Sequence, residues 1–278
     1  MTGIAQTVAE NLLMKLFVEP LLMLWRGRSL LLATTRSDLR ARYAGSVLGL
    51  AWLLIYPLLF LGCYAAVYLY IFQVRFPQFS SKEYVAVIFC GLIPFLAFSE
   101  SLGLGVGSVT SNASLIKNTL FPIDLVPVKA ALMSQPLQIV GFVMLIAAAG
   151  LMHKLTHAVV LLPVVWVLQL MMTMGLLWIL SSLNVFLRDL QNIVSVVVLM
   201  LMMVSPIAYT VDMVPAGVKP LLAFNPLYYV IVSYQKIIIL GEMPSWRFLG
   251  VYAAVSLGLF FIGYWFFSRL KRVFADNV

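Results

Sequence analysis

The sequence predicts an all-α integral membrane protein with six transmembrane helices. The first observation is composition, because 63% of the 278 residues are hydrophobic, only 10% are charged, and the mean hydropathy is +1.04. A soluble domain is closer to half apolar and a quarter charged. The second observation is the spacing of charged residues, which leaves six apolar windows near the roughly 20 residues that cross a bilayer. An ordinary soluble enzyme is therefore excluded.

The first 46 residues precede these windows and have a mixed character. Their apolar residues are interrupted by charged side chains and by Pro20. That pattern favours amphipathic helical segments lying at the cytoplasmic membrane surface, with Trp25 and the basic residues at headgroup level. We therefore expect an interface region over residues 1–46 and a six-span membrane domain over residues 47–278.

The six spans are bounded by the flanking charges. We expect them near Val47–Gln73, Tyr84–Gly107, Ala130–Met152, Ala158–Leu183, Asp189–Asp212 and Arg247–Arg269. An even number of spans places both termini on one side. If that side is the cytoplasm, the inner segments carry twice as many of the 18 Lys and Arg residues as the outer ones, which is the usual bias. Arg269, Lys271 and Arg272 then end the last span at the inner surface.

The segment between the last two spans, 205–246, is too apolar for a solvated loop. It contains LLAFNPLYYVIVSYQKIIIL and several prolines. If residues 222–240 formed a seventh span, the C-terminus and its three basic residues would lie outside. Short helices that dip back from the outer face fit better, because irregular backbone is tolerated at membrane depth where protein covers it. The spanning alternative stays open at this point.

The chain lacks the residue patterns of catalysis. No GxxxxGK[ST] loop is present, so nucleotide hydrolysis would need another chain. His153 and His157 have no third ligand nearby for a metal. Cys63 and Cys90 lie in apolar stretches and are expected to pack as small apolar residues. We expect no catalytic residue, metal or cofactor in this chain.

The connection between spans two and three stands out by its length and composition. SNASLIKNTLFPIDLVP offers about two helical turns before a proline. A short helix with apolar anchors and a polar edge suits docking to a cytoplasmic partner. An ordinary interhelical turn is the alternative. The candidate docking residues are Asn112, Leu115, Ile116, Lys117 and Asn118.

Two charged features lie near the inner surface. Arg36 and Arg40 share a helical face at i,i+4, and Arg42 and Tyr43 follow them. This cluster is suited to bind lipid phosphate or to anchor the helix. Glu100 lies near the inner end of span two, where a carboxylate costs up to about 2.5–3.5 kcal/mol on insertion scales. We expect it to face protein or water, although no intramembrane partner is evident in the sequence.

Five segments follow one another in the order found in polysaccharide-exporting ABC transporter permeases. They are SDLRARYAGSVLGLAWLLIYPL, GLIPFLAFSE, NASLIKNTLFPIDLVPVK, LNVFLRDLQNIV and SPIAYTVDMVP…FNPLYYVI. The chain resembles this family from about Arg36 to its end. The resemblance implies a membrane subunit that exports O-antigen, capsule or teichoic acid chains across the bacterial inner membrane.

The resemblance also implies partners. It implies a homodimer, two separate ATPase subunits that hold ATP and Mg²⁺ and a lipid-linked polysaccharide substrate, together with periplasmic or outer-membrane export proteins for the complete pathway. It makes the segment Asn112–Leu120 the coupling helix and places outer gate helices after span five. The family's channel is lined by aromatic residues that stack on sugars. Candidates for channel or gate in this chain are Tyr56, Glu100, Tyr209, Asn225, Pro226, Tyr228 and Tyr229.

Three other functions remain open from the sequence. An ABC permease of the same architecture could move a smaller lipid or a drug. A proton-coupled secondary transporter could use Glu100, but such proteins typically show internal repeats and several membrane-buried charges. A membrane glycosyltransferase would need a carboxylate pair or base placed for chemistry. The identity of the sugar and of its lipid anchor is not encoded in any motif.

Overall fold

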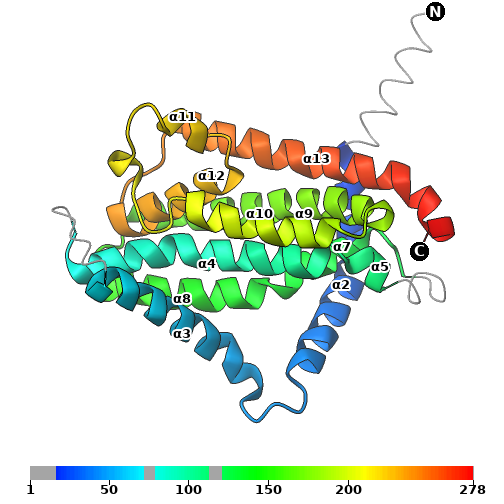
Figure 1. Ribbon diagram of the computed structural model, residues 1–278, viewed down its shortest axis with the longest axis horizontal. Coiled ribbons are helices and arrows are strands. Elements are labelled where there is room, and N and C mark those ends of the chain that lie inside the picture. The colour runs from blue at the N-terminus through cyan, green and yellow to red at the C-terminus, as the bar shows by residue number, and fades with distance from the viewer. Residues whose placement is uncertain (1–16, 72–78, 113–120, 278) are drawn as a thin grey trace, which may run out of the picture.

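A computed structural model of the chain describes residues 17–71, 79–112 and 121–277. Every regular element in these ranges is a helix. The helices form an elongated bundle whose long axis lies horizontally in Figure 1. Five of them are long and apolar enough to cross a membrane: Gly49–Ile71, Ser81–Gly105, Leu125–Leu151, His157–Phe186 and Trp246–Phe274.

In the described part of the interface region, residues 17–46, one continuous helix, α2 (Glu19–Tyr43), stands in place of several short pieces. Pro20 does not break it, because a proline in the first turn gives up an N–H that has no intrahelical partner there. The helix lies at an angle to the bundle (Figure 1). It packs closely on the next layer at Gly27, where an added Cβ would lie 2.7 Å from Cδ1 of Leu125.

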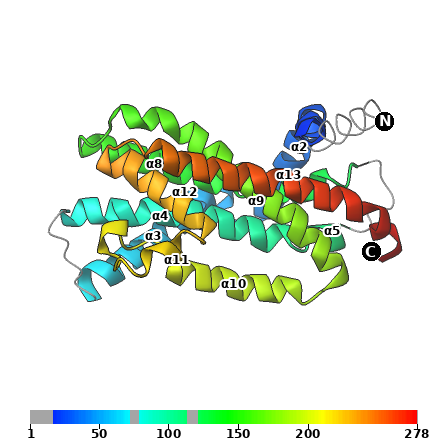
Figure 2. The ribbon, with the colours of Figure 1, turned by 90° about the horizontal axis from the view of Figure 1, so that it is seen from above.

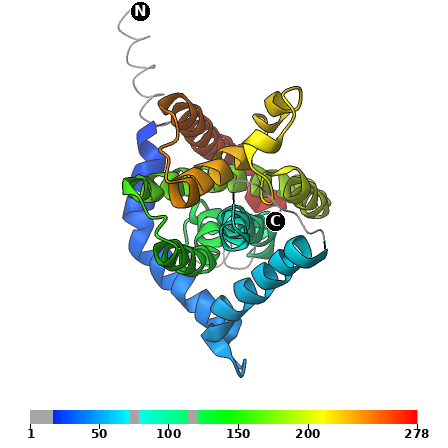
Figure 3. The same cartoon turned by 90° about the vertical axis from the view of Figure 1, so that its left-hand side faces the viewer.

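The first two spans differ strongly in burial. Span one consists of η2 (Gly49–Ala51), α3 (Trp52–Ala66) and η3 (Val67–Ile71), and only 17% of its apolar window is buried. Span two, α4 (Ser81–Gly105), is 72% buried and lies at the centre of the bundle viewed end-on in Figure 3. α3 therefore lies at the edge of the fold and α4 at its core.

The remaining long spans complete the bundle around α4. Span three is divided at Ser134 into α7 (Leu125–Met133) and α8 (Gln135–Leu151). Span four is η4 (His157–Leu161) with α9 (Leu162–Phe186), and the last span is α13 (Trp246–Asn277). α9 and α13 touch backbone to backbone, since a Cβ added at Gly263 would lie 2.2 Å from the carbonyl oxygen of Gly175.

The predicted fifth span, Asp189–Asp212, forms a shorter helix than expected. α10 (Leu190–Val204) has 15 residues, which is about 22 Å at 1.5 Å per residue and short of the roughly 30 Å hydrocarbon core. The helix stops because the residue before a proline avoids helical geometry, and Ser205 before Pro206 is extended. Five spans are thus long enough by themselves, and the sixth stays a prediction.

The apolar segment after α10 contains four short helices. They are η5 (Val211–Met213), α11 (Lys219–Leu222), α12 (Pro226–Gln235) and η6 (Lys236–Leu240). α10 ends and α13 begins at the same end of the bundle, which both side views show (Figures 1 and 2). The segment therefore leaves and returns at one end, as a re-entrant pair would, and α12 and η6 bury most of their side chains. The assignment of this segment as re-entrant gate helices stays a prediction.

Charged side chains pair at both ends of the bundle. At the end where α4 begins, Lys154 contacts Glu83 at 2.6 Å. At the end where α13 finishes, Lys129 contacts Asp38 at 2.7 Å and Lys271 contacts Asp124 at 2.8 Å. The long apolar middle between these ends is the arrangement expected of a membrane protein.

Candidate functional site

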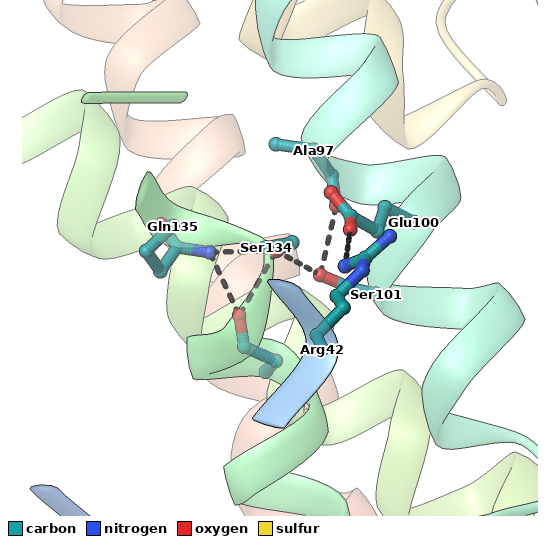
Figure 4. A network of polar contacts seen from close by, with 7 residues as sticks. Arg42, Ala97, Glu100, Ser101, Ser134 and Gln135 are labelled. Atoms are coloured by element: carbon teal, nitrogen blue, oxygen red, sulfur yellow. Dashed lines mark hydrogen bonds and ion pairs between the residues drawn. The ribbon is translucent and has the colours of Figure 1, made fainter. Parts of the chain in front are cut away.

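An ion pair joins the interface helix to the central span. Nη1 of Arg42, near the end of α2, donates to Oε1 of Glu100 on α4. Figure 4 shows the two side chains meeting from opposite elements. Partial burial works against the charged guanidinium, but the adjacent carboxylate outweighs it and raises the pKa of Arg42 above its ordinary value. Glu100 thus faces protein, and its partner Arg42 lies 58 residues earlier in the chain, outside the spans.

The pair forms one wall of a pocket between α2, α3, α4 and α8. Its volume is about 350 Å³, within the range of small-ligand sites. The wall residues are Arg42, Tyr43, Trp52, Leu53, Tyr56, Leu96, Ser99, Glu100 and Leu137. Four residues that the sequence proposed for separate roles therefore line one space: Arg42, Tyr43, Tyr56 and Glu100.

The chemistry of this pocket suits a polar ring with an apolar face. Tyr43, Trp52 and Tyr56 supply aromatic surfaces, and the Arg42 guanidinium lies 5.8 Å from the centre of the Tyr43 ring. The guanidinium offers several N–H donors and the Glu100 carboxylate several acceptor sites beyond the bond between them. Sugars combine such apolar faces with rims of hydroxyl groups. The pocket can therefore bind a sugar ring, and it holds no arrangement for covalent chemistry.

A buried hydrogen-bond network supports the wall next to Glu100. The hydroxyls of Ser101 on α4 and Ser134 at the α7–α8 junction lie 2.6 Å apart, and Ser101 also donates to the Ala97 carbonyl at 2.8 Å. Gln135 donates to Ser134 at 3.2 Å and accepts from Trp166 of α9 at 2.8 Å. Figure 4 shows the contacts that join Ala97, Ser101, Ser134 and Gln135 next to the ion pair. This network fixes the helical turn that carries Glu100.

An aromatic ladder extends from the pocket along α3 and into η3. Tyr56, Phe60, Tyr64 and Tyr68 follow at every fourth residue, with successive ring centres 6.2, 6.4 and 5.0 Å apart and the planes nearly parallel. Tyr56 is 49% exposed and the other three rings are half-buried. Of these four residues only Tyr56 is a channel candidate from the sequence, although the four-residue spacing of the aromatics is itself a sequence signal.

The other basic residues of the cluster lie elsewhere. Arg36 and Arg40 are exposed on α2, outside the pocket, and they make no ion pair in the part of the chain that the structure describes. They therefore remain candidates for contact with lipid phosphate, whereas Arg42 is engaged with Glu100.

The gate candidates after α10 have structural contacts of their own. Asn225 caps α12, since its Oδ1 accepts from the Leu227 N–H at 3.0 Å and its Nδ2 donates to Ser205 at 2.8 Å. Pro226 occupies the first turn of that helix. Tyr228 and Tyr229 pack edge-on or tilted against Phe248 of α13, and the Tyr209 hydroxyl donates to the Val204 carbonyl. A role for these residues in lining a channel stays a prediction.

The proposed docking segment falls mostly outside the described residues. Asn112 follows the four-residue α5 (Ser108–Ser111), and its side-chain amide donates to the Ser108 carbonyl at 2.8 Å. Leu115, Ile116, Lys117 and Asn118 lie within the segment that is not described. Across the described residues, no three His, Cys, Asp or Glu side chains are grouped to hold a metal ion.

Comparison with known proteins gives consistent matches over most of the chain. A family model described as "ABC-2 type transporter" matches residues 29–239. The chain is 30% identical to an O-antigen export system permease protein RfbA of Myxococcus xanthus, over 92% of this chain and 97% of that protein. It is 28% identical to an RfbA of Klebsiella pneumoniae, over 89% and 94%, and 23% identical to the polysialic acid transport protein KpsM of Escherichia coli, over 81% and 87%.

Proposed function

Because the chain belongs to the ABC-2 type transporter family, we propose that it is the permease subunit of an ATP-driven polysaccharide exporter. Its relatives are named for the export of O-antigen and the transport of polysialic acid, both of which are polysaccharides. The cargo is a lipid-linked polysaccharide that crosses the bacterial inner membrane from the cytoplasm. This chain supplies the path, and it performs no chemistry on the cargo.

The aromatic ladder of α3 is the observation that carries the proposal. Aromatic rings bury large apolar faces and take preferred stacked or tilted geometries with other flat surfaces. Tyr56 is 49% exposed and the other three rings are half-buried, but the four form one row along which a sugar chain can pass from one ring to the next. No deep single site is needed, and none would help a polymer to move. A permease for a small lipid or drug has less use for such a row.

The alternative of proton coupling through Glu100 is disfavoured by the ion pair. The Glu100 carboxylate is already engaged by the Arg42 guanidinium of α2, and both side chains line the same pocket. Glu100 therefore serves better as a fixed wall of the pocket than as a proton carrier. The energy for transport comes instead from ATP.

The ATP is hydrolysed by two partner subunits in this proposal, since the chain contains no phosphate-binding loop. These subunits, which hold ATP and Mg²⁺, dock on the cytoplasmic side through the coupling segment Asn112–Leu120. Both termini of the permease lie on that side.

A second copy of the chain completes the path. α3 and α10 flank α4 on one side of the bundle (Figure 3) and expose apolar side chains that lipid or protein must cover. On α10 these are Ile193, Val196, Val197, Leu199, Met200, Met203 and Val204. A homodimer that brings these faces together would enclose the ladders of both copies.

The test is a set of ladder variants in cells that depend on this permease for surface polysaccharide. Tyr64→Ala removes one ring from the middle of the row, and we expect polysaccharide to accumulate inside while the permease reaches the membrane and its ATPase partner co-purifies. Tyr64→Phe keeps the ring and should keep export. Tyr70→Ala, in the same span but 78% exposed and outside the row, is the matched control. Surface polysaccharide at the wild-type level in Tyr64→Ala would contradict the proposal.

A further inference from the structure

A second cavity lies away from the Arg42–Glu100 pocket, between α2, the start of α7 and the end of α13. Its volume is about 640 Å³. The residues that line it are Val18, Glu19, Leu22, Met23, Arg26, Gly27, Leu30, Pro122, Asp124, Leu125, Tyr264 and Lys271. The cavity thus combines a largely apolar wall with four charged side chains, two of each sign.

Two of these charges neutralise each other. Nζ of Lys271 lies 2.9 and 2.8 Å from the two carboxylate oxygens of Asp124. The Asp124 side chain is only 11% exposed, and its backbone carbonyl accepts a hydrogen bond from the Trp178 indole at 2.9 Å. This pair is a fixed part of the wall, so it leaves the other two charges of the cavity without compensation.

Those two charges, Glu19 and Arg26, lie on one face of α2. They are seven residues apart, which is two helical turns and about 10 Å along the axis. Both are exposed, and neither makes an ion pair with another residue that the structure describes. The Tyr264 hydroxyl lies beside Glu19 and adds a further polar group at that end. The open cavity therefore presents one cation and one anion at a fixed separation.

The surroundings indicate that lipid reaches this cavity. α2 exposes Leu21 and Leu22, and Trp25 is 65% exposed with the Arg28 guanidinium 4.1 Å from its ring centre. Trp and Arg in this combination are typical of the boundary between headgroups and acyl chains. The Leu22, Leu30 and Leu125 side chains of the cavity continue the same apolar surface inward.

We propose that this cavity binds a single phospholipid whose headgroup carries both a phosphate and a primary ammonium, as in phosphatidylethanolamine. Arg26 pairs with the phosphate, Glu19 accepts from the ammonium, and the acyl chains lie along the leucines. Charge complementarity selects this lipid class. An anionic headgroup would meet Glu19 without compensation, and a trimethylated ammonium has no N–H to donate to the carboxylate.

Such a lipid would tie the interface helix α2 to the last span α13. It would contact α2 through Glu19 and Arg26 and lie against the Asp124–Lys271 pair, which already joins α7 to α13. The inference concerns the stability of this corner of the permease and does not depend on the nature of the transported cargo.

The experiment uses the purified full-length protein in detergent with added dioleoyl lipids that differ only in headgroup. We expect the ethanolamine lipid to raise the melting temperature more than the choline or glycerol lipid, and native mass spectrometry of an equimolar mixture to show it retained preferentially. Equal stabilisation and equal retention of all three headgroups, or preference for the anionic glycerol lipid, would overturn the proposal.

Variants locate the effect. Glu19→Gln and Arg26→Gln should each weaken retention of the ethanolamine lipid about tenfold, which corresponds to about 1.4 kcal/mol. Arg28→Gln is the control on the same helix, since the Arg28 side chain is engaged with the Trp25 carbonyl at 2.7 Å and does not line the cavity. Unchanged retention in both cavity variants would also overturn the proposal. The comparison of headgroups uses only the wild-type protein, so it tests the proposal even if a variant folds poorly.

Discussion

Removal of Arg42 should destabilise the protein more than removal of its partner Glu100. The Glu100 side chain is 20% exposed and that of Arg42 is 41% exposed. Arg42→Ala leaves an unpaired carboxylate that is largely buried, whereas Glu100→Gln leaves a guanidinium that solvent reaches and an amide oxygen that can still accept from it. The ranking of the two variants therefore follows from the difference in burial.

The magnitude can be bracketed. Breaking a fully buried pair costs about 3–5 kcal/mol, and breaking an exposed one about 0–1 kcal/mol. The intermediate burial of this pair places Arg42→Ala at about 1–2 kcal/mol. For a protein of this size, 1 kcal/mol shifts the melting temperature by about 2–4 °C. We therefore expect a loss of about 2–8 °C for Arg42→Ala and a smaller loss for Glu100→Gln.

The assay is the apparent melting temperature of each purified variant in one detergent, followed by size-exclusion chromatography after heating. The double variant is the sharpest comparison, because Arg42→Ala with Glu100→Gln contains no unpaired buried charge and should be more stable than Arg42→Ala alone. Arg40→Ala, two residues away on the same helix and exposed, should change little. If the double variant loses the sum of the two single losses, the pair is not coupled and the reasoning is refuted.

Three further predictions concern packing, coupling and orientation. Gly263→Ala should lower the melting temperature by forcing a Cβ to within 2.2 Å of the α9 backbone, whereas Gly258→Ala, with no atom within 4 Å, should not. Leu115→Asp should weaken co-purification of the ATPase and reduce surface polysaccharide without preventing insertion. If both stay at the wild-type level, the coupling assignment is wrong and the segment is only a long turn. Single cysteines placed at Thr156 and at Gly217 should react with a membrane-impermeant reagent in intact cells. Labelling of a cysteine at the C-terminus instead would show that the chain has the opposite orientation.

Hydropathy predicted the long helices because it is a local property of the chain. The first two windows, Val47–Gln73 and Tyr84–Gly107, became helical spans at Gly49–Ile71 and Ser81–Gly105. The fifth window shows where this reasoning stops. Its borders were set by the charges at 189 and 212, and the proline at 206 within it ends the helix early.

The candidate site is harder to predict from the sequence than the helices are, because it depends on contacts between segments that are distant in the chain. Arg42 belongs to a basic cluster and Glu100 is a charge near the end of span two, and both features are visible in the sequence. No sequence pattern predicts that these two side chains form an ion pair. A buried cluster of polar side chains also depends on contacts between distant segments. In this cluster Gln138 donates to Gln169 at 2.7 Å, and Gln169 donates to the Pro94 carbonyl at 3.1 Å and accepts from Tyr234 at 3.1 Å. The aromatic ladder, by contrast, is a local four-residue pattern that the sequence contains, but single aromatic residues in a span do not reveal it.

Hydropathy also cannot tell which span is central, and the reason is physical. The windows of α3 and α4 are equally hydropathic, yet 17% of one and 72% of the other is buried. Lipid tails are as apolar as a protein core, so the transfer free energy that identifies a span is the same for both surroundings. What separates the two helices is the fit of individual residues: an added Cβ at Gly91 or Gly105 of α4 would collide with Ile207 or Leu177, whereas Gly62 of α3 has open space around it. Close contacts at small residues therefore fix α4 in the core, whereas α3 has open space at Gly62 and lies at the edge of the fold.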